Sequence, residues 1–256
     1  MNVIRGIAEL RAMLRSREAG VVGLVPTMGA LHAGHESLFR AARAECTTVV
    51  ASVFVNPAQF GDPADLEHYP RDEPHDVATA EHAGVDVLFA PTLEEMYPPG
   101  FDTWIEVERL GSILEGAFRP GHFRGVATIC LKLFNCVRPE RVYFGQKDAQ
   151  QVQVIRQMIR DLHLDAELRV CPTVRDADGL ALSSRNARLS PAERFRALAL
   201  PRALATADAD TARAILRDLD VEYLEVAPFD PPVLAAAVRV GGVRLIDNVP
   251  LERGPS

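Results

Sequence analysis

Two histidines three positions apart follow a short apolar segment near the start of the chain. The segment Val21–Val25 runs into the sequence PTMG, and His32 and His35 come next with Gly34 between them. Val21–Val25 is too short for a helix and is predicted to be a buried strand, whereas residues 33–45 follow helical spacing. Both imidazoles then lie on one face of the first helical turn, where the helix dipole attracts anions. The spacing therefore predicts that both histidines donate hydrogen bonds to phosphate oxygens.

Polar side chains also follow two further predicted strands. Asn56 and Gln59 come after the β-branched segment 47–55, and Lys147 follows the apolar segment 141–145. The carboxyl ends of parallel strands meet at one edge of a sheet, where ligands of open α/β folds bind. The amide of Gln59 can contact a hydroxyl and a carboxylate together, and the compact charge of Lys147 suits a phosphate. Lys147 is also one of only two lysines among the 28 Lys and Arg residues.

The elements that position these groups alternate between helix and strand. Helices are predicted over residues 3–18 (with Asn2 as the N-cap), 33–45, 72–82, 122–137 and 148–162, and strands over 21–25, 47–55, 85–90 and 141–145, with an edge strand over 103–108. Continuous β-branched strands that alternate with helices are typical of a parallel sheet covered on both faces. We therefore predict an α/β protein whose N-terminal domain, residues 1–174, is a Rossmann-like, doubly wound parallel sheet.

The last third of the chain predicts a smaller α+β domain over residues 175–256. Its Ala-rich helical part runs to residue 219, and strand-like segments occupy residues 221–229 and 238–249. Such a domain, next to a nucleotide-binding sheet, is interpreted as a lid.

A loop in this region carries three candidate phosphate ligands. Ser183, Ser184 and Arg185 follow the turn signal Asp178-Gly179, which predicts that they lie on a mobile loop able to close over ATP. Two hydroxyls and a guanidinium in succession can bind the oxygens of a triphosphate. The same sequence is also common in exposed loops, so the phosphate role depends on its context.

The composition disfavours several function classes. The chain has 256 residues, of which 48% are hydrophobic and 25% are charged, as in a typical globular protein. The net charge of −7 disfavours a nucleic-acid partner, because such proteins carry a basic excess. No apolar segment is long enough for a membrane span or a signal peptide, so we expect a cytoplasmic enzyme. The four cysteines lack a C-x-x-C pair and are predicted to be buried and reduced, with zinc or a disulfide as less favoured alternatives.

The sequence HAGH at residues 32–35 resembles the H-x-G-H signature of the nucleotidyltransferase superfamily. A narrower resemblance, to the pantoate–β-alanine ligase family, rests on five segments: PTMGALHAGHESL, FVNPAQFG, DLEHYPR, RPGHFRGVATICLKLFNCVRPERVYFGQKDAQQ and DGLALSSRNARLS. They cover most of residues 21–190 in the family's order. The resemblance implies that ATP and pantoate form a pantoyl-adenylate with release of pyrophosphate. β-Alanine then attacks the acyl carbon, which yields pantothenate, a coenzyme A precursor.

The resemblance also implies ligands and an assembly. The substrates are ATP, pantoate and β-alanine, and Mg²⁺ neutralises the triphosphate. Because the sequence has no dense carboxylate cluster, the metal is expected on the phosphates, and no residue is predicted as a metal ligand. The family also implies a homodimer, although no segment of the sequence indicates an interface.

Roles for individual residues follow from the same resemblance. His35 matches the catalytic histidine, and His32 and Lys147 complete the catalytic set. Gln59 and Gln151 match the two pantoate glutamines, and Asn56 and Tyr69 are added to the substrate site. The predicted ATP-binding residues are Met28, Gly29, Ala30, Leu31, His32, Ala33, Gly34, His35, Gly145, Gln146, Lys147, Asp148, Val174, Leu182, Ser183, Ser184 and Arg185.

The chain departs from the family pattern at four positions and in length. The residues concerned are Ala58, Leu182, Gln146 and Ala149, where the family often has Met, Met, Glu and an aromatic residue. None of them removes a group to which a chemical role is assigned. The C-terminal domain is shorter than usual for the family, which leaves the completeness of the lid open. Lys132 receives no role and is interpreted as a surface side chain whose charge reaches water.

Three other functions remain to be compared. A nucleotidyltransferase that adenylylates a phosphate would share the H-x-G-H loop but would not require FVNPAQF and GQKDAQQ. An aminoacyl-tRNA synthetase is disfavoured by the acidic charge and by the lack of room for an anticodon-binding domain. A nucleotide sensor without turnover would retain the ATP segment alone, whereas this chain keeps both Gln59 and Gln151. The ligase is therefore the favoured hypothesis.

Overall fold

The structure is a computed structural model that describes residues 1–16 and 20–251. The chain divides into two compact units. The first comprises Met1–Phe144 and Val154–Cys171, and the second comprises Gly145–Gln153 and Pro172–Ser256. The predicted boundary between residues 174 and 175 stays a prediction. The predicted end of the first helix, at Glu18, lies outside the described residues.

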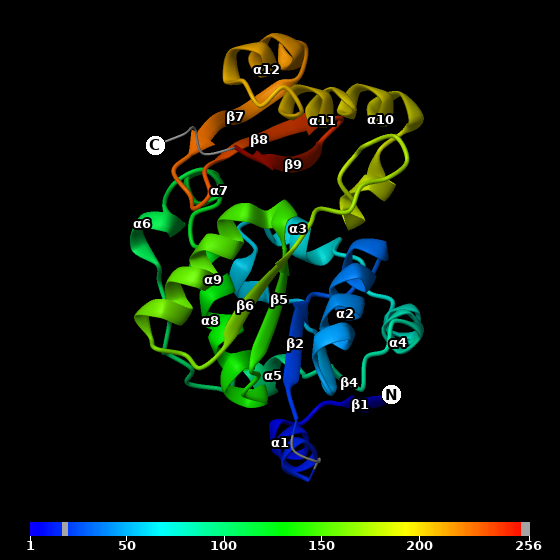
Figure 1. The fold of residues 1–256 in the computed structure, drawn as a ribbon, viewed down its shortest axis with the longest axis vertical. Coiled ribbons are helices and arrows are strands. Elements are labelled where there is room, and N and C mark those ends of the chain that lie inside the picture. Colours follow the sequence, from blue (N-terminus) through cyan, green and yellow to red (C-terminus); the bar gives the residue numbers. More distant parts are fainter. Residues whose placement is uncertain (17–19, 252–256) are drawn as a thin grey trace. The chain divides into compact units, whose positions relative to one another are not determined.

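The first unit contains a six-stranded sheet in the order β1-β4-β3-β2-β5-β6 (Figure 1). Its strands are β1 (Asn2–Ile4), β2 (Val22–Thr27), β3 (Thr48–Val53), β4 (Val87–Phe89), β5 (Arg141–Gly145) and β6 (Glu167–Cys171). The β1–β4, β4–β3, β3–β2 and β2–β5 pairs are parallel. From β2 the chain moves outward to β3 and β4 and then returns to the other side of β2. This reversal is that of a doubly wound sheet, so the predicted Rossmann-like fold is confirmed.

Helices connect the strands of this sheet. They are α1 (Ile7–Arg15), α2 (Ala33–Glu45), α3 (Pro63–Glu67), α4 (Glu73–His82), α5 (Leu93–Met96), α6 (Glu108–Gly111), α7 (Glu115–Phe118), α8 (His122–Val137) and α9 (Ala149–Asp161), with a 3₁₀ turn η1 (Pro57–Gln59). Parallel crossovers are right-handed, so helices before and after the reversal lie on opposite faces of the sheet. The predicted helices over residues 33–45 and 122–137 match α2 and α8 at both ends.

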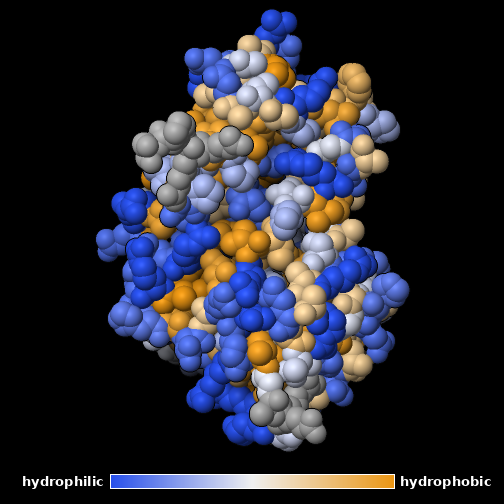
Figure 2. Space-filling model, viewed as in Figure 1, coloured by the Kyte–Doolittle hydropathy of each residue, from blue (hydrophilic) through white to orange (hydrophobic). Residues whose placement is uncertain are grey.

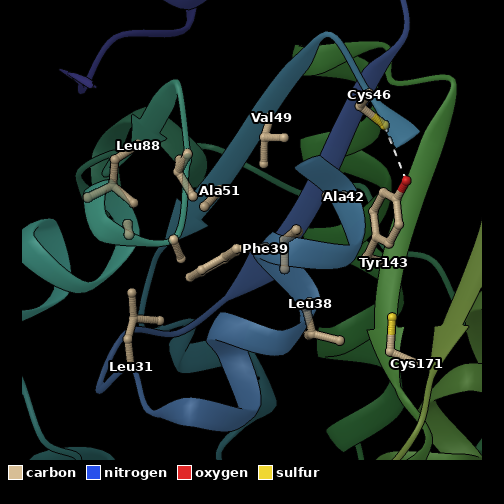
Figure 3. Close-up of a cluster of buried hydrophobic side chains, with 14 residues drawn as sticks. Leu31, Leu38, Phe39, Ala42, Cys46, Val49, Ala51, Leu88, Tyr143 and Cys171 are labelled. Atoms are coloured by element: carbon tan, nitrogen blue, oxygen red, sulfur yellow. Dashed lines mark hydrogen bonds between the residues drawn. The ribbon is translucent and has the colours of Figure 1, made fainter. Parts of the chain in front are cut away.

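One buried cluster joins α2 to the sheet. Phe39 and Ala42 pack against Val49 and Leu88, and the cluster extends to Tyr143 (Figure 3). The Sγ atom of Cys46 and the hydroxyl of Tyr143 lie 3.2 Å apart within hydrogen-bond reach. All four cysteines are buried and free, as predicted. This packing fixes α2 and therefore the position of its first turn.

Two elements predicted in the first unit are wrong. The first helix begins at Ile7 after Gly6, and Asn2–Ile4 form a strand beside β4 instead of a helix capped by Asn2. The β-branched Val3 and Ile4 favour that pairing, and Gly6 interrupts the helical pattern. Residues 103–108 form no strand, because residues 103–107 are irregular and Glu108 begins α6.

The irregular segment is held by α8 instead of by a strand ladder. The N–H of Ile105 donates to Thr128 Oγ1 at 3.0 Å. Lys132 Nζ lies 4.4 Å from the ring centroid of Phe101 and 5.5 Å from that of Tyr97, and its burial lowers the pKa of its ammonium group. Lys132 is partly buried and its charge packs on aromatic rings, so its interpretation as a surface side chain whose charge reaches water stays a prediction.

The second unit contains an antiparallel sheet in the order β7-β8-β9. Its elements are η2 (Gln146–Asp148), η3 (Ser184–Arg188), α10 (Pro191–Ala197), α11 (Ala199–Leu204), α12 (Ala209–Leu216), β7 (Asp220–Ala227), β8 (Val233–Val240) and β9 (Val243–Pro250). The predicted strand over residues 238–249 is two strands, because Gly241 and Gly242 form a turn with positive φ values. A separate core of leucine and alanine side chains joins helices to sheet, which confirms the predicted α+β class.

The surface of the molecule is mixed. On the face shown in Figure 2, hydrophilic residues surround smaller hydrophobic areas. Among the residues that the structure describes, no helix has the length and apolar character needed to span a membrane.

Candidate active site

The turn between β2 and α2 is shaped by two left-handed residues and one carboxylate. Gly29 has φ of 80° and Ala30 has φ of 51°, so the N–H groups that follow point to one side. Asp76 of α4 accepts hydrogen bonds there from Ala30 N at 3.1 Å and Leu31 N at 2.7 Å. A Cβ atom at Gly29 would lie 2.6 Å from Asp76 Oδ2. The carboxylate therefore holds the turn that precedes the histidines, and only glycine fits beside it.

Two side chains of α4, Asp76 and His75, support this turn. Asp76 is 2% exposed. Burial raises the pKa of the Asp76 carboxyl above its usual range, while the hydrogen bonds from Leu31 and Ala30 counteract that rise. The neighbouring His75 places its Nε2 3.2 Å from the carbonyl oxygen of Leu31. Helix α4 thus holds both a donor group and an acceptor group of the turn.

Both predicted histidines lie in the first turn of α2. His32 is the N-cap and its Nδ1 accepts from Gly34 N at 3.1 Å, while His35 Nδ1 accepts from His32 N at 3.3 Å. Their ring centroids are 4.2 Å apart. Because each Nδ1 is an acceptor, each neutral ring carries its proton on Nε2. The capping box therefore fixes the tautomer that makes each Nε2–H a donor.

The predicted substrate residues Asn56 and Gln59 follow β3, which pairs with β2 up to Thr27 and Val53. Asn56 is 1% exposed, and its Nδ2 donates to Gln59 Oε1 at 3.0 Å and to Gly125 O at 3.1 Å. Its Oδ1 accepts from Tyr97 at 2.8 Å and from the N–H of Ala58 at 3.3 Å. The Asn56 amide makes two donated and two accepted hydrogen bonds within the protein. Its hydrogen bond to Gln59 Oε1 therefore fixes the orientation of the Gln59 side chain.

The backbone of Gln59 is held just as closely. Its carbonyl oxygen lies 2.8 Å from His122 Nδ1 and accepts from Arg119 at 3.3 Å. A Cβ atom at Gly125 of α8 would lie 2.3 Å from the Ala58 carbonyl oxygen, which shows how closely α8 approaches this turn. Tyr69, another predicted substrate residue, is half-buried and packs edge-on to Phe60 with ring centroids 5.6 Å apart.

In the second unit, Lys147 lies in the turn η2, and its side chain is 21% exposed. Its ammonium nitrogen is 3.8 Å from Asp148 Oδ1, and Gln151 follows one turn later in α9. Asn248 of β9 donates from Nδ2 to the carbonyl oxygens of Gln146 and Lys147, each at 2.9 Å. The backbone that carries Lys147 is therefore held by a buried side chain 101 residues away.

The remaining predicted ATP residues belong to a hairpin-like loop of the same unit. Leu182 N donates to Val174 O at 3.0 Å, so these two residues lie opposite one another. Ser183 caps η3, since its hydroxyl accepts from Arg185 N at 3.2 Å. Arg194 pairs with Asp176 and with Asp178, at 2.5 and 2.8 Å, and so anchors the base of the loop.

The chain matches the family model described as pantoate-beta-alanine ligase over residues 2–250. It belongs to that family. Pantothenate synthetase from Roseiflexus castenholzii is 50% identical over 278 residues, covering 98% of this chain and 100% of the relative. That alignment is longer than this chain of 256 residues, so the relative carries residues that this chain lacks.

Solved structures of the family have the same fold. Pantothenate synthetase from Thermus thermophilus aligns with a TM-score of 0.92 and 45% identity, covering 98% of this chain and 99% of that one. A pantoate-beta-alanine ligase from Francisella tularensis, complexed with beta-gamma ATP and beta-alanine, aligns with a TM-score of 0.88 and 36% identity over 100% of both chains. The expected family membership is confirmed.

The predicted site residues are divided between the two units of the chain. His32, His35, Asn56 and Gln59 follow neighbouring strand ends in the first unit, and Phe54 N donates to Thr27 O at 3.2 Å between those strands. The second set comprises Gly145, Gln146, Lys147, Asp148, Gln151, Val174, Leu182, Ser183, Ser184 and Arg185. Within the described ranges, no group of three or more His, Cys, Asp or Glu side chains is arranged to hold a metal ion.

Sequence reasoning missed Asp76 and Asn248. Asp76 lies at helical spacing from the buried Ala80 and Ala83, so its place on an apolar face was the available signal. Asp247 and Asn248 are two consecutive polar residues between the apolar Ile246 and Val249 of a predicted strand. Both signals indicate a buried polar group with a partner, but neither identifies that partner.

Proposed function

We propose that this chain catalyses the ATP-dependent condensation of (R)-pantoate with β-alanine to pantothenate, AMP and pyrophosphate. The observation that carries the proposal is the pair of histidines at the positive end of α2, whose Nδ1 atoms are both acceptors. Two Nε2–H donors at a helix N-terminus suit the phosphate oxygens of a nucleotide. The family match and the ligand-bound relative from Francisella tularensis supply the substrate class.

In the first step a pantoate carboxylate oxygen attacks the α-phosphorus of ATP. A new P–O bond forms and the bond to the bridging oxygen breaks, so that pyrophosphate leaves with the electron pair. His32 and His35 stabilise the negative charge that develops on the phosphate oxygens, and Lys147 contributes a positive charge. Ser183, Ser184 and Arg185 bind the β- and γ-phosphate oxygens. The backbone and side chains of Met28–Gly34, Gly145, Gln146, Asp148, Val174 and Leu182 complete the ATP contacts.

In the second step the amine of β-alanine attacks the acyl carbon of the enzyme-bound pantoyl-adenylate. A C–N bond forms, the C–O bond to AMP breaks, and the amine gives up a proton. Gln59 and Gln151 hold pantoate through their amides, with Tyr69 beside the substrate. Asn56 orients Gln59 through the Nδ2–Oε1 hydrogen bond of 3.0 Å. Catalysis therefore depends on positioning and electrostatics, without a covalent enzyme intermediate.

Magnesium enters this proposal with ATP. A divalent cation neutralises the triphosphate and makes pyrophosphate a better leaving group. The described residues offer no cluster of carboxylates for it, so we place the ion on the phosphate oxygens as MgATP. A homodimer, which rests on the family resemblance, and a cytoplasmic location, which rests on the sequence analysis, are likewise proposals.

The test is exchange of labelled pyrophosphate into ATP, with magnesium present and β-alanine absent. We expect exchange that requires pantoate, and pantothenate and AMP once β-alanine is added. Removing a well-placed donor costs on the order of 10²–10³ in kcat, so His35→Ala and Lys147→Ala should lose exchange on that scale. His82→Ala, which alters an exposed histidine of α4, is the matched control and should retain activity.

Two results would contradict the proposal. ATP binding without pantoate-dependent exchange would exclude pantoate as the acceptor. Folded His35→Ala and Lys147→Ala proteins with wild-type turnover would show that these two residues have other roles.

A further inference from the structure

Asn248 makes three side-chain hydrogen bonds to the segment that carries Lys147. Its Nδ2 donates to the carbonyl oxygens of Gln146 and Lys147, each at 2.9 Å, and its Oδ1 accepts from Gln146 Nε2 at 3.0 Å. Asn248 is 4% exposed. Its amide has two donor hydrogens and one acceptor oxygen, and all of these are committed to this one turn.

We infer that Asn248 is a positioning residue that sets the direction of the Lys147 side chain for the adenylation step. The inference rests on the proposed function of Lys147. The carbonyl of Gln146 belongs to the peptide unit before the Lys147 Cα atom, and the carbonyl of Lys147 belongs to the peptide unit after it. Fixing both peptide units fixes φ and ψ of Lys147, and with them the direction of its Cα–Cβ bond.

The anchor itself is rigid. Asn248 lies in β9 opposite Ala235 of β8, and its N–H donates to Asp247 Oδ1 at 2.8 Å. Asp247, whose side chain is 1% exposed, makes a two-pronged ion pair with Arg175 at 2.6 and 3.0 Å. A site residue is best supported by neighbours whose own positions are fixed by hydrogen bonds. Asn248 is therefore a fixed point from which the turn is held.

A neutral amide is well suited to this task. Two hydrogens on one nitrogen can reach two adjacent carbonyl oxygens, which a hydroxyl or a carboxylate cannot do. Asn248→Asp keeps the shape but turns an anionic oxygen toward both carbonyls, so it should repel them. Asn248→Ser retains one donor, and Asn248→Ala retains none. The expected order of turnover is wild type, then Ser, then Ala and Asp.

The decisive experiment is a double-mutant cycle in the pyrophosphate exchange assay. We expect Asn248→Ala to lower kcat about tenfold or more and to leave the KM for pantoate within about twofold, because it acts through a group used in the transition state. In the Lys147→Ala background the same change should lower kcat by less than about twofold, since residues that act as one unit are not additive. Gln153→Ala, which removes a 3.3 Å bond to Asp230 in the same unit, is the matched control.

The outcomes are separable. Equal losses of kcat from Asn248→Ala with and without Lys147 would overturn the inference, because a purely structural residue gives additive effects. So would wild-type turnover in a folded Asn248→Ala or Asn248→Asp protein. If the alanine variant does not fold, the serine variant supplies the cycle. Absence of pantoate-dependent exchange in the wild type would refute the proposed function and this inference together, whereas additive losses with normal wild-type exchange refute the inference alone.

Discussion

Asp76 and Asn248 hold two turns of the molecule by opposite means. Asp76 accepts from the N–H groups of Ala30 and Leu31 in the first unit. Asn248 donates to the carbonyl oxygens of Gln146 and Lys147 in the second. Each side chain satisfies two consecutive backbone groups of a turn that bears predicted phosphate ligands.

The difference between the two follows from the backbone of each turn. In the first turn the positive φ values of Gly29 and Ala30 align N–H groups, which attract an anion. In the second, two carbonyl groups face the holding residue, so a donor is required. The first side chain can titrate, whereas the second cannot. The turn before the histidines is therefore held by an ionisable side chain, and the turn that carries Lys147 is held by a neutral one.

Among the substitutions that test this comparison of the two turns, Asp76→Ala is expected to have the largest effect. It leaves two backbone N–H groups without their acceptor, at a cost of roughly 1–3 kcal/mol for each group that stays buried. It also frees the turn that precedes His32 and His35. We expect a loss on the order of 10²-fold in kcat for pyrophosphate exchange, together with a lower urea midpoint.

Asp210→Ala provides the control, because that side chain is 96% exposed. A folded Asp76→Ala protein with wild-type kcat would show that the turn keeps its conformation unaided. Asp76 would then contribute to the stability of the fold but not to catalysis.

Gly29→Ala should have a smaller effect on the same turn. The new Cβ would lie 2.6 Å from Asp76 Oδ2 and 3.0 Å from Val53 Cγ1, at a φ of 80°. Gly100 has φ of 83° and open space around it, so Gly100→Ala measures the backbone strain alone, about 1–2 kcal/mol. Urea unfolding of both variants should show the larger loss at Gly29, with kcat reduced about tenfold in that variant only. Equal losses would mean that Asp76 can move aside.

The smallest expected effect is a difference in pH dependence. The folded-state pKa of Asp76 is raised from 3.8 by burial. Protonation of Asp76 therefore favours the folded state. This contribution to the free energy of unfolding is complete below pH 3.8 and is lost as the pH rises through the pKa of the folded state. Because Asn does not titrate, the Tm of the wild type minus that of Asp76→Asn should fall across this interval. The Tm of the wild type minus that of Asn248→Ala should stay constant over the same pH interval. A matching fall in that difference would show that the pH dependence does not distinguish the Asp76 turn from the Asn248 turn.

Much of the fold could be predicted because its signals are local. The apolar spacing of residues 122–137 gives α8 from end to end, and the chain leaves the helix at Arg138, with φ of 53°, before a proline. The histidine turn was predictable for the same reason, since His32 and His35 cap their own helix.

The missed features depend on partners far away in the sequence. Asn2–Ile4 form a strand because β4 lies beside them, and this pairing competes with a helical pattern that extends over the same residues. Asp76 and Asn248 are separated from their partners by up to 46 and 102 residues. Spacing shows that such a polar residue is on a buried face, but only the packed fold supplies the backbone groups that it binds.

The place of Asn248 in the chain has a consequence for synthesis on the ribosome. The predicted ATP and pantoate residues all precede residue 186, and the side-chain hydrogen bonds that hold the histidine turn come from α4. The Lys147 turn, in contrast, waits for β9, which is made 101 residues after it. Because domains fold as they emerge, a growing chain can form the histidine turn before the Lys147 turn is held in place. An incomplete chain can therefore contain every predicted substrate-binding residue and still lack turnover.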